Sequence, residues 1–262
     1  MRVLPKPCSA PTAFKPEDLL ASVREVRNLP RTDVPEVCLL EFDGDLTDWL
    51  AATGRSRVCD AWACFHTRMH LFDADGFEAG MVDRTIGGPY AVLVAEQLLA
   101  SGARVILGLT SAGRIAPDLR LPAVVVAQSA LRDEGTSHHY LPPADVVETD
   151  ESLVRALYSE LQGMEADTRI GIVWTTDAPY RETLEQIEGY RAQGVLAVEM
   201  QAASLYAFAQ ARGVACGVVA HVSNAVDHRG DGQFDRGGEE TGFDLAVRMA
   251  RAGRRWLREV GS

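Results

Sequence analysis

The sequence predicts an α/β fold in which helices cover both faces of a mostly parallel sheet. Two observations predict this class. From residue 37 onward, short apolar runs that are typical of buried strands alternate with segments of helical apolar spacing. Strands buried on both faces show continuous apolar runs, which is the pattern of parallel sheets between layers of helices. The 262 residues, 47% of them hydrophobic, are also enough to form one large core.

The expected elements follow one another along the chain. Four prolines keep the first 16 residues irregular, and we interpret residues 1–35 as an N-terminal appendage before a main domain of residues 36–262. Pro89, Gly102 and Asp150 are residue types that favour a helix start, a helix end and an N-cap. Strands are expected at 37–42, 105–109, 121–127, 170–174, 196–198 and 214–222. Helices are expected at 15–27, 89–100, after Asp150, and at 181–193, 202–212 and 241–260.

Charge and cysteine content exclude several functional classes. The formal net charge of −11 repels phosphate backbones and anionic lipids, so we expect neither a nucleic acid polymer nor a membrane as partner. The five cysteines form no Cys-x-x-Cys pair, and His138 and His139 lack a ligand partner at useful spacing. We therefore expect no disulfide framework and no metal site. No signal-like stretch and no run of ~18 apolar residues is present, so the cytoplasm is the expected location.

Candidate site residues lie where the predicted strands end, because ligands of such folds bind there. Thr110 and Ser111 follow a buried strand. Their hydroxyls and the backbone N–H groups up to Gly113 can hold an anion, while the alternative is a tight turn that needs glycine. After another strand, Asp177 either contacts a ligand or caps the next helix. Tyr180 either stacks on a base or fills the core.

Two further strand ends carry polar residues. Glu199 lies between a buried strand and an apolar helix, and a buried carboxylate needs partners, so it has a specific hydrogen-bonding role, towards a ligand or within the structure. Gln201 offers a donor and an acceptor, which suits sugar hydroxyls, or is a solvated residue of the first helical turn. Ser223 and Asn224 follow the last long strand, where Asn224 either contacts a ring nitrogen or adopts a turn.

Five stretches, in this order, resemble the hexameric-type nucleoside phosphorylase family, which includes purine nucleoside and uridine phosphorylases and related nucleosidases. The last of them is similar to the family's Val-Glu-Met-Glu-Ala-Ala signature, and the chain resembles a divergent member from about Val37 to its end. The stretches are Ile86-Gly-Gly-Pro89, Thr110-Ser-Ala-Gly113, Arg132-Asp-Glu-Gly-Thr-Ser137, Thr175-Thr-Asp177 and Ala197-Val-Glu-Met-Gln-Ala-Ala203.

The resemblance implies a three-layer αβα sandwich around a twisted mixed sheet, assembled as a homodimer or homohexamer. It also implies roles for the candidate residues. The loop of Thr110, Ser111 and Gly113 would lie at the phosphate. Glu199, Met200 and Gln201 would bind substrate, the last two at the ribose. Tyr180 would lie near the base pocket, and Ser223 and Asn224 would face the base as the catalytic residues.

The cationic residues that the family uses for phosphate are missing. The family's first loop reads Gly-Asp-Pro followed by an arginine, whereas Phe42–Thr47 contains no arginine and extra acid. A second arginine of the family is replaced by Gly108. Each is a charge-assisted contact, so weak phosphate binding is expected unless Arg68 or Arg84, which lie nearby in the sequence, take over.

The expected function is the cleavage of a nucleoside by phosphate into a free base and a sugar 1-phosphate. No cofactor is expected, and phosphate is then the co-substrate. Two alternatives stay open. The missing arginines favour a nucleosidase that uses water. The neutral Gln201 and Asn224, which replace carboxylates of the family, favour a non-catalytic nucleoside-binding homologue, because an amide cannot act as a general acid.

Overall fold

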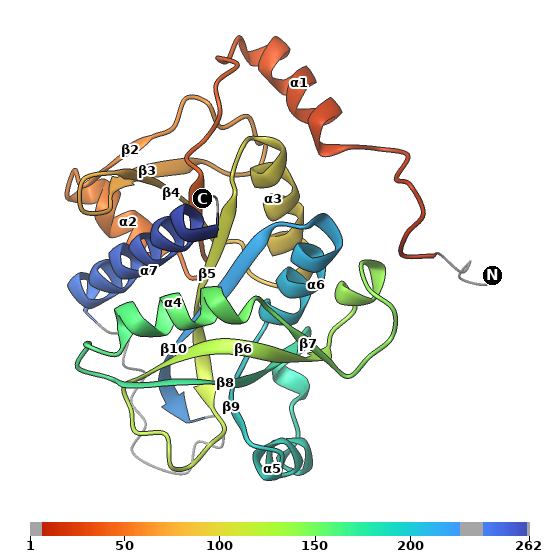
Figure 1. Cartoon of the computed structure of the whole chain (residues 1–262), viewed down its shortest axis with the longest axis vertical. Coiled ribbons are helices and arrows are strands. Elements are labelled where there is room, and N and C mark those ends of the chain that lie inside the picture. The colour runs from red at the N-terminus through yellow and green to blue at the C-terminus, as the bar shows by residue number, and fades with distance from the viewer. Residues whose placement is uncertain (1–6, 226–237, 261–262) are drawn as a thin grey trace.

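One mixed sheet forms the centre of the molecule, and helices lie on both of its faces (Figure 1). The computed structural model describes residues 7–225 and 238–260, and the elements below belong to those residues. This arrangement confirms the predicted α/β class. The strands are β1 (Val37–Glu41), β2 (Ser56–Val58), β3 (Met69–Asp73), β4 (Glu78–Asp83), β5 (Val105–Arg114), β6 (Ala123–Asp133), β7 (Val146–Glu148), β8 (Asp167–Thr176), β9 (Val195–Glu199) and β10 (Ala215–Ala225). The helices are α1 (Pro16–Arg27), α2 (Asp45–Ala52), α3 (Gly88–Ala100), α4 (Glu151–Leu161), α5 (Leu184–Ala192), α6 (Ala202–Arg212) and α7 (Glu239–Val260), with short 3₁₀ turns η1 (Ser137–His139) and η2 (Pro179–Arg181).

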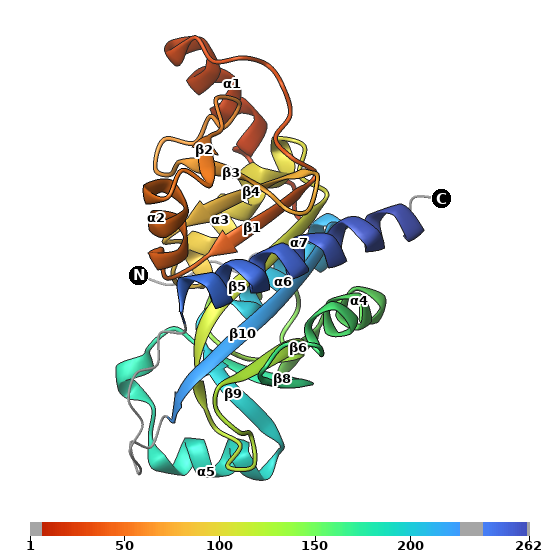
Figure 2. The same ribbon diagram turned by 90° about the vertical axis from the view of Figure 1, so that its left-hand side faces the viewer.

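The sheet has an open part and a closed part. From β2 the order runs through β3, β4, β1, β5, β9, β8 and β6 to β10, and β7 pairs with β6. Because β10 also pairs with β5, the five strands β5, β9, β8, β6 and β10 close into a ring, while β1 to β4 extend the sheet on one side (Figure 2). Parallel pairing joins β1 to β4 and β5, β5 to β10, and β8 to β6 and β9. The remaining pairs are antiparallel.

Both faces of β1 are buried, which explains why this strand reads as a continuous apolar run. Cys38 and Leu40 of β1 belong to the core cluster that contains α3 and α6. Val37 and Leu39 belong to the cluster that contains α2, α4 and α7. Successive side chains of a strand point to opposite faces, so β1 contributes to both helix layers.

Local signals set several helix ends where the sequence predicts them. The Asp150 side chain accepts hydrogen bonds from the N–H groups of Ser152 and Leu153, at 2.8 and 3.0 Å, and caps α4. Helix α6 spans 202–212 as expected. One helix start differs from the prediction. The helix expected at 181–193 begins at Leu184, because Thr183 forms a capping box with Gln186, and Asp177 is therefore not its cap.

The sequence reading omitted α2, β2 to β4 and β7. Helix α2 has no local cap. Instead the Glu41 carboxylate at the end of β1 accepts from the N–H of Gly44 at 2.6 Å and from the N–H and hydroxyl of Thr47 at 3.3 and 3.0 Å. The β3–β4 hairpin turns at Asp75 and Gly76, both at positive φ. An Asp-Gly pair is a standard hairpin signal, so this hairpin was predictable.

The N-terminal helix α1 packs on the main body. Leu20 and Val23 are buried against Ala63, with Ala100 at the end of α3 beside them. The Arg27 guanidinium also donates to the carbonyl of Cys64 at 3.2 Å. Within the described ranges, none of the helices has the length and apolar character needed to cross a lipid bilayer.

Helices α3 and α6 approach each other closely at their N-terminal ends. A Cβ atom on Gly88, the first residue of α3, would lie 2.1 Å from the Ser204 hydroxyl of α6 and 3.4 Å from that of Thr136. Steric exclusion therefore requires a glycine at position 88. The contact brings the N-terminal ends of two helices together beside the C-terminal ends of β6, β8 and β9.

We expect Gly88→Ala to destabilise the protein by about 1–3 kcal/mol, because the added methyl group overpacks the α3–α6 contact. Gly189 in α5 is the matched control, since a Cβ there would meet nothing within 4 Å. Gly189→Ala should be stabilising by roughly 0.5–1 kcal/mol, because it only reduces backbone freedom. Urea unfolding of both variants tests the contact, and equal stabilities would contradict it.

Candidate active site

Thr110–Gly113, predicted as a loop after a strand, belong to strand β5 and pair with β10, so the predicted anion loop is an extended segment. This segment meets the predicted sugar residue, Gln201, which follows β9. The hydroxyl of Thr110 lies 3.3 Å from the amide oxygen of Gln201, and both side chains are buried. The backbone N–H of Met200 also donates to that oxygen, at 3.2 Å. A backbone N–H can only donate, so the contact fixes the orientation of the Gln201 amide. Gln201 is therefore not the solvated first-turn residue of the alternative interpretation.

Asp43 occupies the donors of the predicted anion loop. Its carboxylate accepts from the backbone N–H of Ser111 at 3.2 Å and from the Ser111 hydroxyl at 3.0 Å, and this contact is exposed. These are two of the groups expected to hold phosphate. An external anion must therefore displace an internal carboxylate or bind beside its negative charge, which is unfavourable.

Glu199 organises the start of α6. Its carboxylate is buried and accepts from the hydroxyl of Thr175 and from the N–H groups of Gln201 at 2.6 Å and Ala202 at 2.8 Å. These contacts fit the structural role that the sequence also allowed, and substrate binding by Glu199 stays a prediction. Burial raises the pKa of Glu199 to about 7, against the lowering effect of these hydrogen bonds.

A second buried carboxylate lies on the neighbouring loop. Glu134 accepts from the Ser204 hydroxyl of α6 at 2.5 Å and from the N–H of Ser137 at 3.0 Å. Its negative charge also contributes to the raised pKa of Glu199. The buried Arg132 guanidinium donates to the Ser137 hydroxyl at 2.8 Å and to the Pro142 carbonyl at 2.7 Å. The Arg132–Ser137 motif thus holds its loop against α6.

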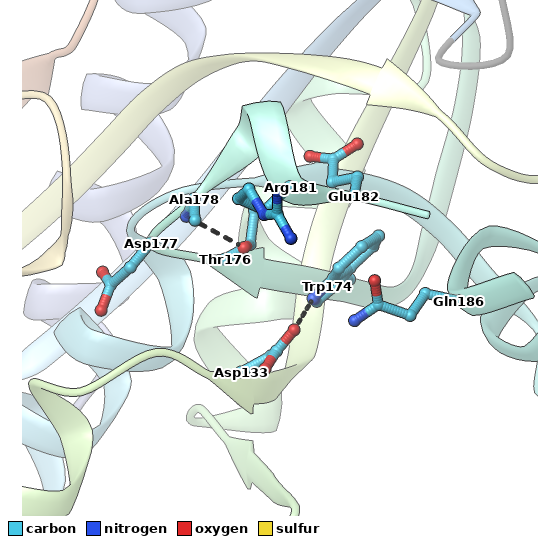
Figure 3. Close-up of a pocket in the computed structure, with 8 residues that line it drawn as sticks. All are labelled: Asp133, Trp174, Thr176, Asp177, Ala178, Arg181, Glu182 and Gln186. Carbon is cyan, nitrogen blue, oxygen red and sulfur yellow. Dashed lines mark hydrogen bonds between the residues drawn. The ribbon is translucent and has the colours of Figure 1, made fainter. Parts of the chain in front are cut away.

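A cavity of about 210 Å³ opens at the ends of β6 and β8, where the chain turns into α5 (Figure 3). The Trp174 ring forms part of its wall and donates from Nε1 to Asp133 at 3.0 Å. Asp177 instead accepts from the N–H of Gly135 at 2.8 Å, which ties the loop after β8 to the loop after β6. The lining residues are Asp133, Trp174, Thr176, Asp177, Ala178, Arg181, Glu182 and Gln186.

Tyr180 lies at the surface of η2 and is 99% exposed. The alternative that it fills the core is wrong, because η2 projects it into solvent. It does not line the cavity either. A place near a bound base stays a prediction for this residue.

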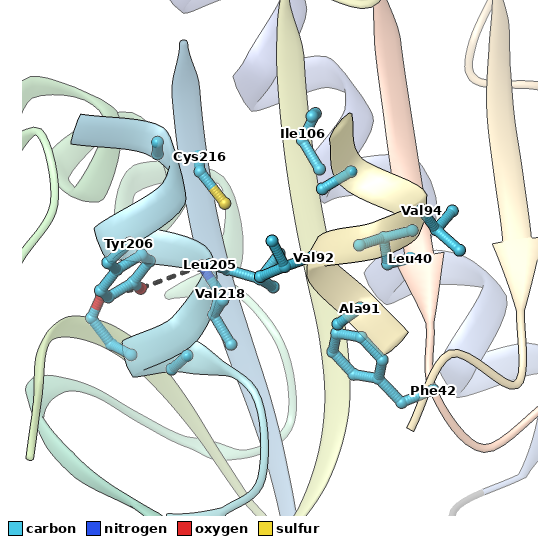
Figure 4. Close-up of a cluster of buried hydrophobic side chains, with 14 of the residues drawn as sticks. Leu40, Phe42, Ala91, Val92, Val94, Ile106, Leu205, Tyr206, Cys216 and Val218 are labelled. Carbon is cyan, nitrogen blue, oxygen red and sulfur yellow. Dashed lines mark hydrogen bonds between the residues drawn. The ribbon is translucent and has the colours of Figure 1, made fainter. Parts of the chain in front are cut away.

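The missing arginine at position 108 has a packing reason. A Cβ on Gly108 would lie 3.1 Å from the Phe42 ring and 3.1 Å from Val218. Figure 4 shows these two side chains on either side of β5. Phe42 therefore fills the space that a side chain at 108 would need, and an arginine there would require the core to move.

Arg84 supplies a cation beside the Phe42–Thr47 stretch from another part of the sequence. Its side chain lies so close to Gly44 that a Cβ there would be 2.7 Å away, and its guanidinium pairs with Asp48 and Asp83. Arg84 and Arg68 both line a second cavity, of about 320 Å³, with His66 and His70 among its other residues. The two acids neutralise much of the charge that Arg84 could offer to an anion.

The two residues predicted to be catalytic lie at the end of β10. The backbone of Asn224 pairs with Gly113 of the anion loop. The side chains of Ser223 and Asn224 lie outside the described part of the structure, so their contact with a base stays a prediction. Among the described residues, no group of three or more His, Cys, Asp or Glu side chains is arranged to hold a metal ion.

Comparison with known proteins identifies the family. The model of a family described as the phosphorylase superfamily matches residues 64–257, which is most of the chain. The chain belongs to the phosphorylase superfamily. This membership confirms the resemblance seen in the sequence. A guanosine phosphorylase of Halorubrum lacusprofundi is 27% identical over 148 residues, which cover 56% of this chain and 61% of that protein. A uridine phosphorylase of Thermococcus kodakarensis is 27% identical over 206 residues, 73% of either protein.

Solved structures of the phosphorylase superfamily share the fold. The purine nucleoside phosphorylase of Toxoplasma gondii, in complex with immucillin-H, superposes with a TM-score of 0.74 at 20% identity, over 88% of this chain and 95% of that one. The uridine phosphorylase of Vibrio fischeri gives a TM-score of 0.68 at 18% identity, over 86% and 90%. Similarity at these identities shows a shared architecture.

Glu199→Gln should change the pH dependence of stability. Because the folded-state pKa is raised, protonated Glu199 contributes stability that is full below its ordinary value of 4.5 and is lost as the pH rises through about 7. Glutamine imitates the protonated form. The variant should therefore gain stability relative to the natural protein between pH 5 and pH 8, by on the order of 3 kcal/mol at most.

Urea unfolding at both pH values measures this gain. Glu188→Gln, at an exposed position of α5, is the control and should show no such trend. If Glu199→Gln had the same effect on stability at pH 5 and pH 8, Glu199 would not titrate in this range.

Proposed function

We propose that this protein cleaves the N-glycosidic bond of a nucleoside, with phosphate as the attacking group. One observation carries the proposal: the Thr110–Gly113 segment of β5, which we expect to offer donors to an anion, contacts Gln201 through Thr110, and Gln201 can offer an amide to a sugar. Phosphorolysis needs an anion site and a sugar site side by side, and this contact supports such an arrangement. The guanosine and uridine phosphorylases among the relatives support the same reaction class.

The reaction places requirements on these residues. The C1′–N bond breaks, its electron pair leaves with the base, and a phosphate oxygen forms the new bond to C1′. Positive charge develops on the sugar and negative charge on the base, so the site must stabilise the separated charges more than the intact nucleoside. The Gln201 amide would hold the sugar through its nitrogen, since Met200 and Thr110 already contact its oxygen. Ser223 and Asn224 would donate to the departing base.

Hydrolysis is the second candidate, and the Asp43–Ser111 contact favours it. A carboxylate that already accepts from the Ser111 N–H and hydroxyl competes with phosphate for these donors. Gly108 and the Phe42–Thr47 stretch supply no arginine to offset that charge, and Arg84 is paired with Asp48 and Asp83. Water needs no cationic site, so it can serve as the nucleophile where phosphate is repelled.

Assembly as a homodimer or homohexamer, and a cytoplasmic location, stay predictions.

A nucleoside panel, incubated with and without phosphate, tests the proposed reaction. Phosphorolysis should release the free base only when phosphate is present, with sugar 1-phosphate as the second product. Free sugar at the same rate without phosphate would establish hydrolysis instead. Nucleoside binding without turnover would exclude both reactions and leave a binding protein.

Replacing Asp43 by serine should separate the two candidates. Loss of the carboxylate frees the Ser111 N–H and removes one negative charge, so the KM for phosphate should fall by about tenfold, the effect of ~1.4 kcal/mol. A nucleosidase would show no new dependence on phosphate. Asp18→Ser, an exposed change on α1, is the charge-matched control. If the KM for phosphate were the same in Asp43→Ser and Asp18→Ser, Asp43 would not compete with phosphate for the donors of Ser111.

A further inference from the structure

The side-chain amide of Gln201 has an occupied oxygen and an available nitrogen. The oxygen accepts from the Met200 N–H at 3.2 Å and lies 3.3 Å from the Thr110 hydroxyl. Among the residues that the structure describes, no group accepts a hydrogen bond from the nitrogen. The residue is buried, yet this nitrogen is not one of the fully buried polar atoms that lack a partner. Both amide N–H groups are therefore open to a ligand.

The acceptors around this amide are already in use by the protein. The buried carboxylate of Glu199, two residues earlier, accepts three hydrogen bonds from protein groups. The Thr110 hydroxyl gives its hydrogen to the carbonyl of Ser111 at 2.8 Å. Gln201 thus offers two donors to a ligand, while the acceptors beside it are held by protein donors.

An amide nitrogen and a carboxylate recognise a sugar in opposite ways. A carboxylate can only accept, so it pairs with the hydrogens of sugar hydroxyls. The Gln201 nitrogen can only donate, so it pairs with a hydroxyl oxygen and leaves the hydroxyl hydrogen without an acceptor. An unpaired donor in a buried site costs more than a neutral hydrogen bond contributes. Each additional hydroxyl on the sugar therefore weakens binding at this position.

We propose that Gln201 makes the site selective for 2′-deoxyribose over ribose. The inference rests on the proposed function, and it adds the sugar class of the substrate. The nitrogen donates to the oxygen of the 3′-hydroxyl, and the absence of a 2′-hydroxyl leaves one hydrogen fewer to be satisfied. Discrimination arises from the unpaired group that ribose would bring, and not from an extra contact to deoxyribose.

Calorimetry with the full-length protein tests the selectivity. The probes are two matched pairs, guanosine with 2′-deoxyguanosine and uridine with 2′-deoxyuridine. We expect the deoxy member of a pair to bind about fivefold more tightly. Gln201→Glu supplies an acceptor, so the ribose member should then bind at least about tenfold more tightly, as a charge-assisted hydrogen bond predicts. Gln193→Glu, at an exposed position after α5, is the matched control and should keep the natural ratio.

Turnover provides a second readout. The two sugars differ in intrinsic reactivity, because a 2′-hydroxyl withdraws electrons from the positive charge that develops on the sugar. The ratio of kcat/KM for the two members is therefore compared between the natural protein and Gln201→Glu, which cancels this difference. We expect the ratio to move by about tenfold towards the ribose member.

Two results would overturn the sugar assignment: tighter binding of the ribose member by the natural protein, or an unchanged ratio in a folded Gln201→Glu variant. The binding comparison on the natural protein needs no variant, so it decides the matter even if Gln201→Glu does not fold. Tighter binding of the deoxy member without turnover would refute the reaction and support the assignment. Turnover with tighter binding of the ribose member would do the reverse. No binding of either pair would refute both.

Discussion

The rest of the site depends on the hydrogen bonds that the buried carboxylate of Glu199 accepts. It joins the end of β9 to the first turn of α6 through the N–H groups of Gln201 and Ala202, and it joins both to β8 through the Thr175 hydroxyl. The first N–H groups of a helix need acceptors, and a carboxylate there also interacts favourably with the helix dipole. Removing it would release the loop that presents Met200 and Gln201.

Glu134 extends this arrangement to the neighbouring loop. Its contact with Ser204 holds the Arg132–Ser137 motif against α6, and Gly88 allows α3 to approach the same place. Each carboxylate accepts several hydrogen bonds, which is how proteins tolerate buried charge. Burial is the main cause of the raised pKa of Glu199, and the nearby charge of Glu134 adds a smaller contribution. The site therefore rests on a packed and hydrogen-bonded frame, which favours a fixed geometry for the residues that would contact a nucleoside.

The part of the site expected to bind an anion differs most from a simple phosphate pocket. The residues that differ there pack against one another. Phe42 fills the space beside Gly108, so the glycine and the aromatic ring depend on each other. Asp43, the next residue, turns towards Ser111, while Arg84 lies against Gly44 and is held by two aspartates. The guanidinium of Arg84 is already paired with Asp48 and Asp83, so the carboxylate of Asp43 leaves the surroundings of Ser111 negative. This negative charge opposes the binding of phosphate more than the binding of water.

The sequence by itself determined the α/β class, the family resemblance, the bounds of α6 and the Asp150 cap, because these depend on apolar spacing and on residues a few positions apart. It also nominated Thr110, Gln201 and Glu199. Only the tertiary structure decided which groups these residues contact. Helix α2 was missed because its cap, Glu41, belongs to a strand. The Asp43–Ser111 contact joins residues 68 positions apart, and the cavity at Glu182 forms between two strand ends and a helix. Such contacts depend on the order and register of the strands in the sheet. Hydrogen bonding between segments that are distant in the sequence sets this order and register, and the local sequence pattern does not.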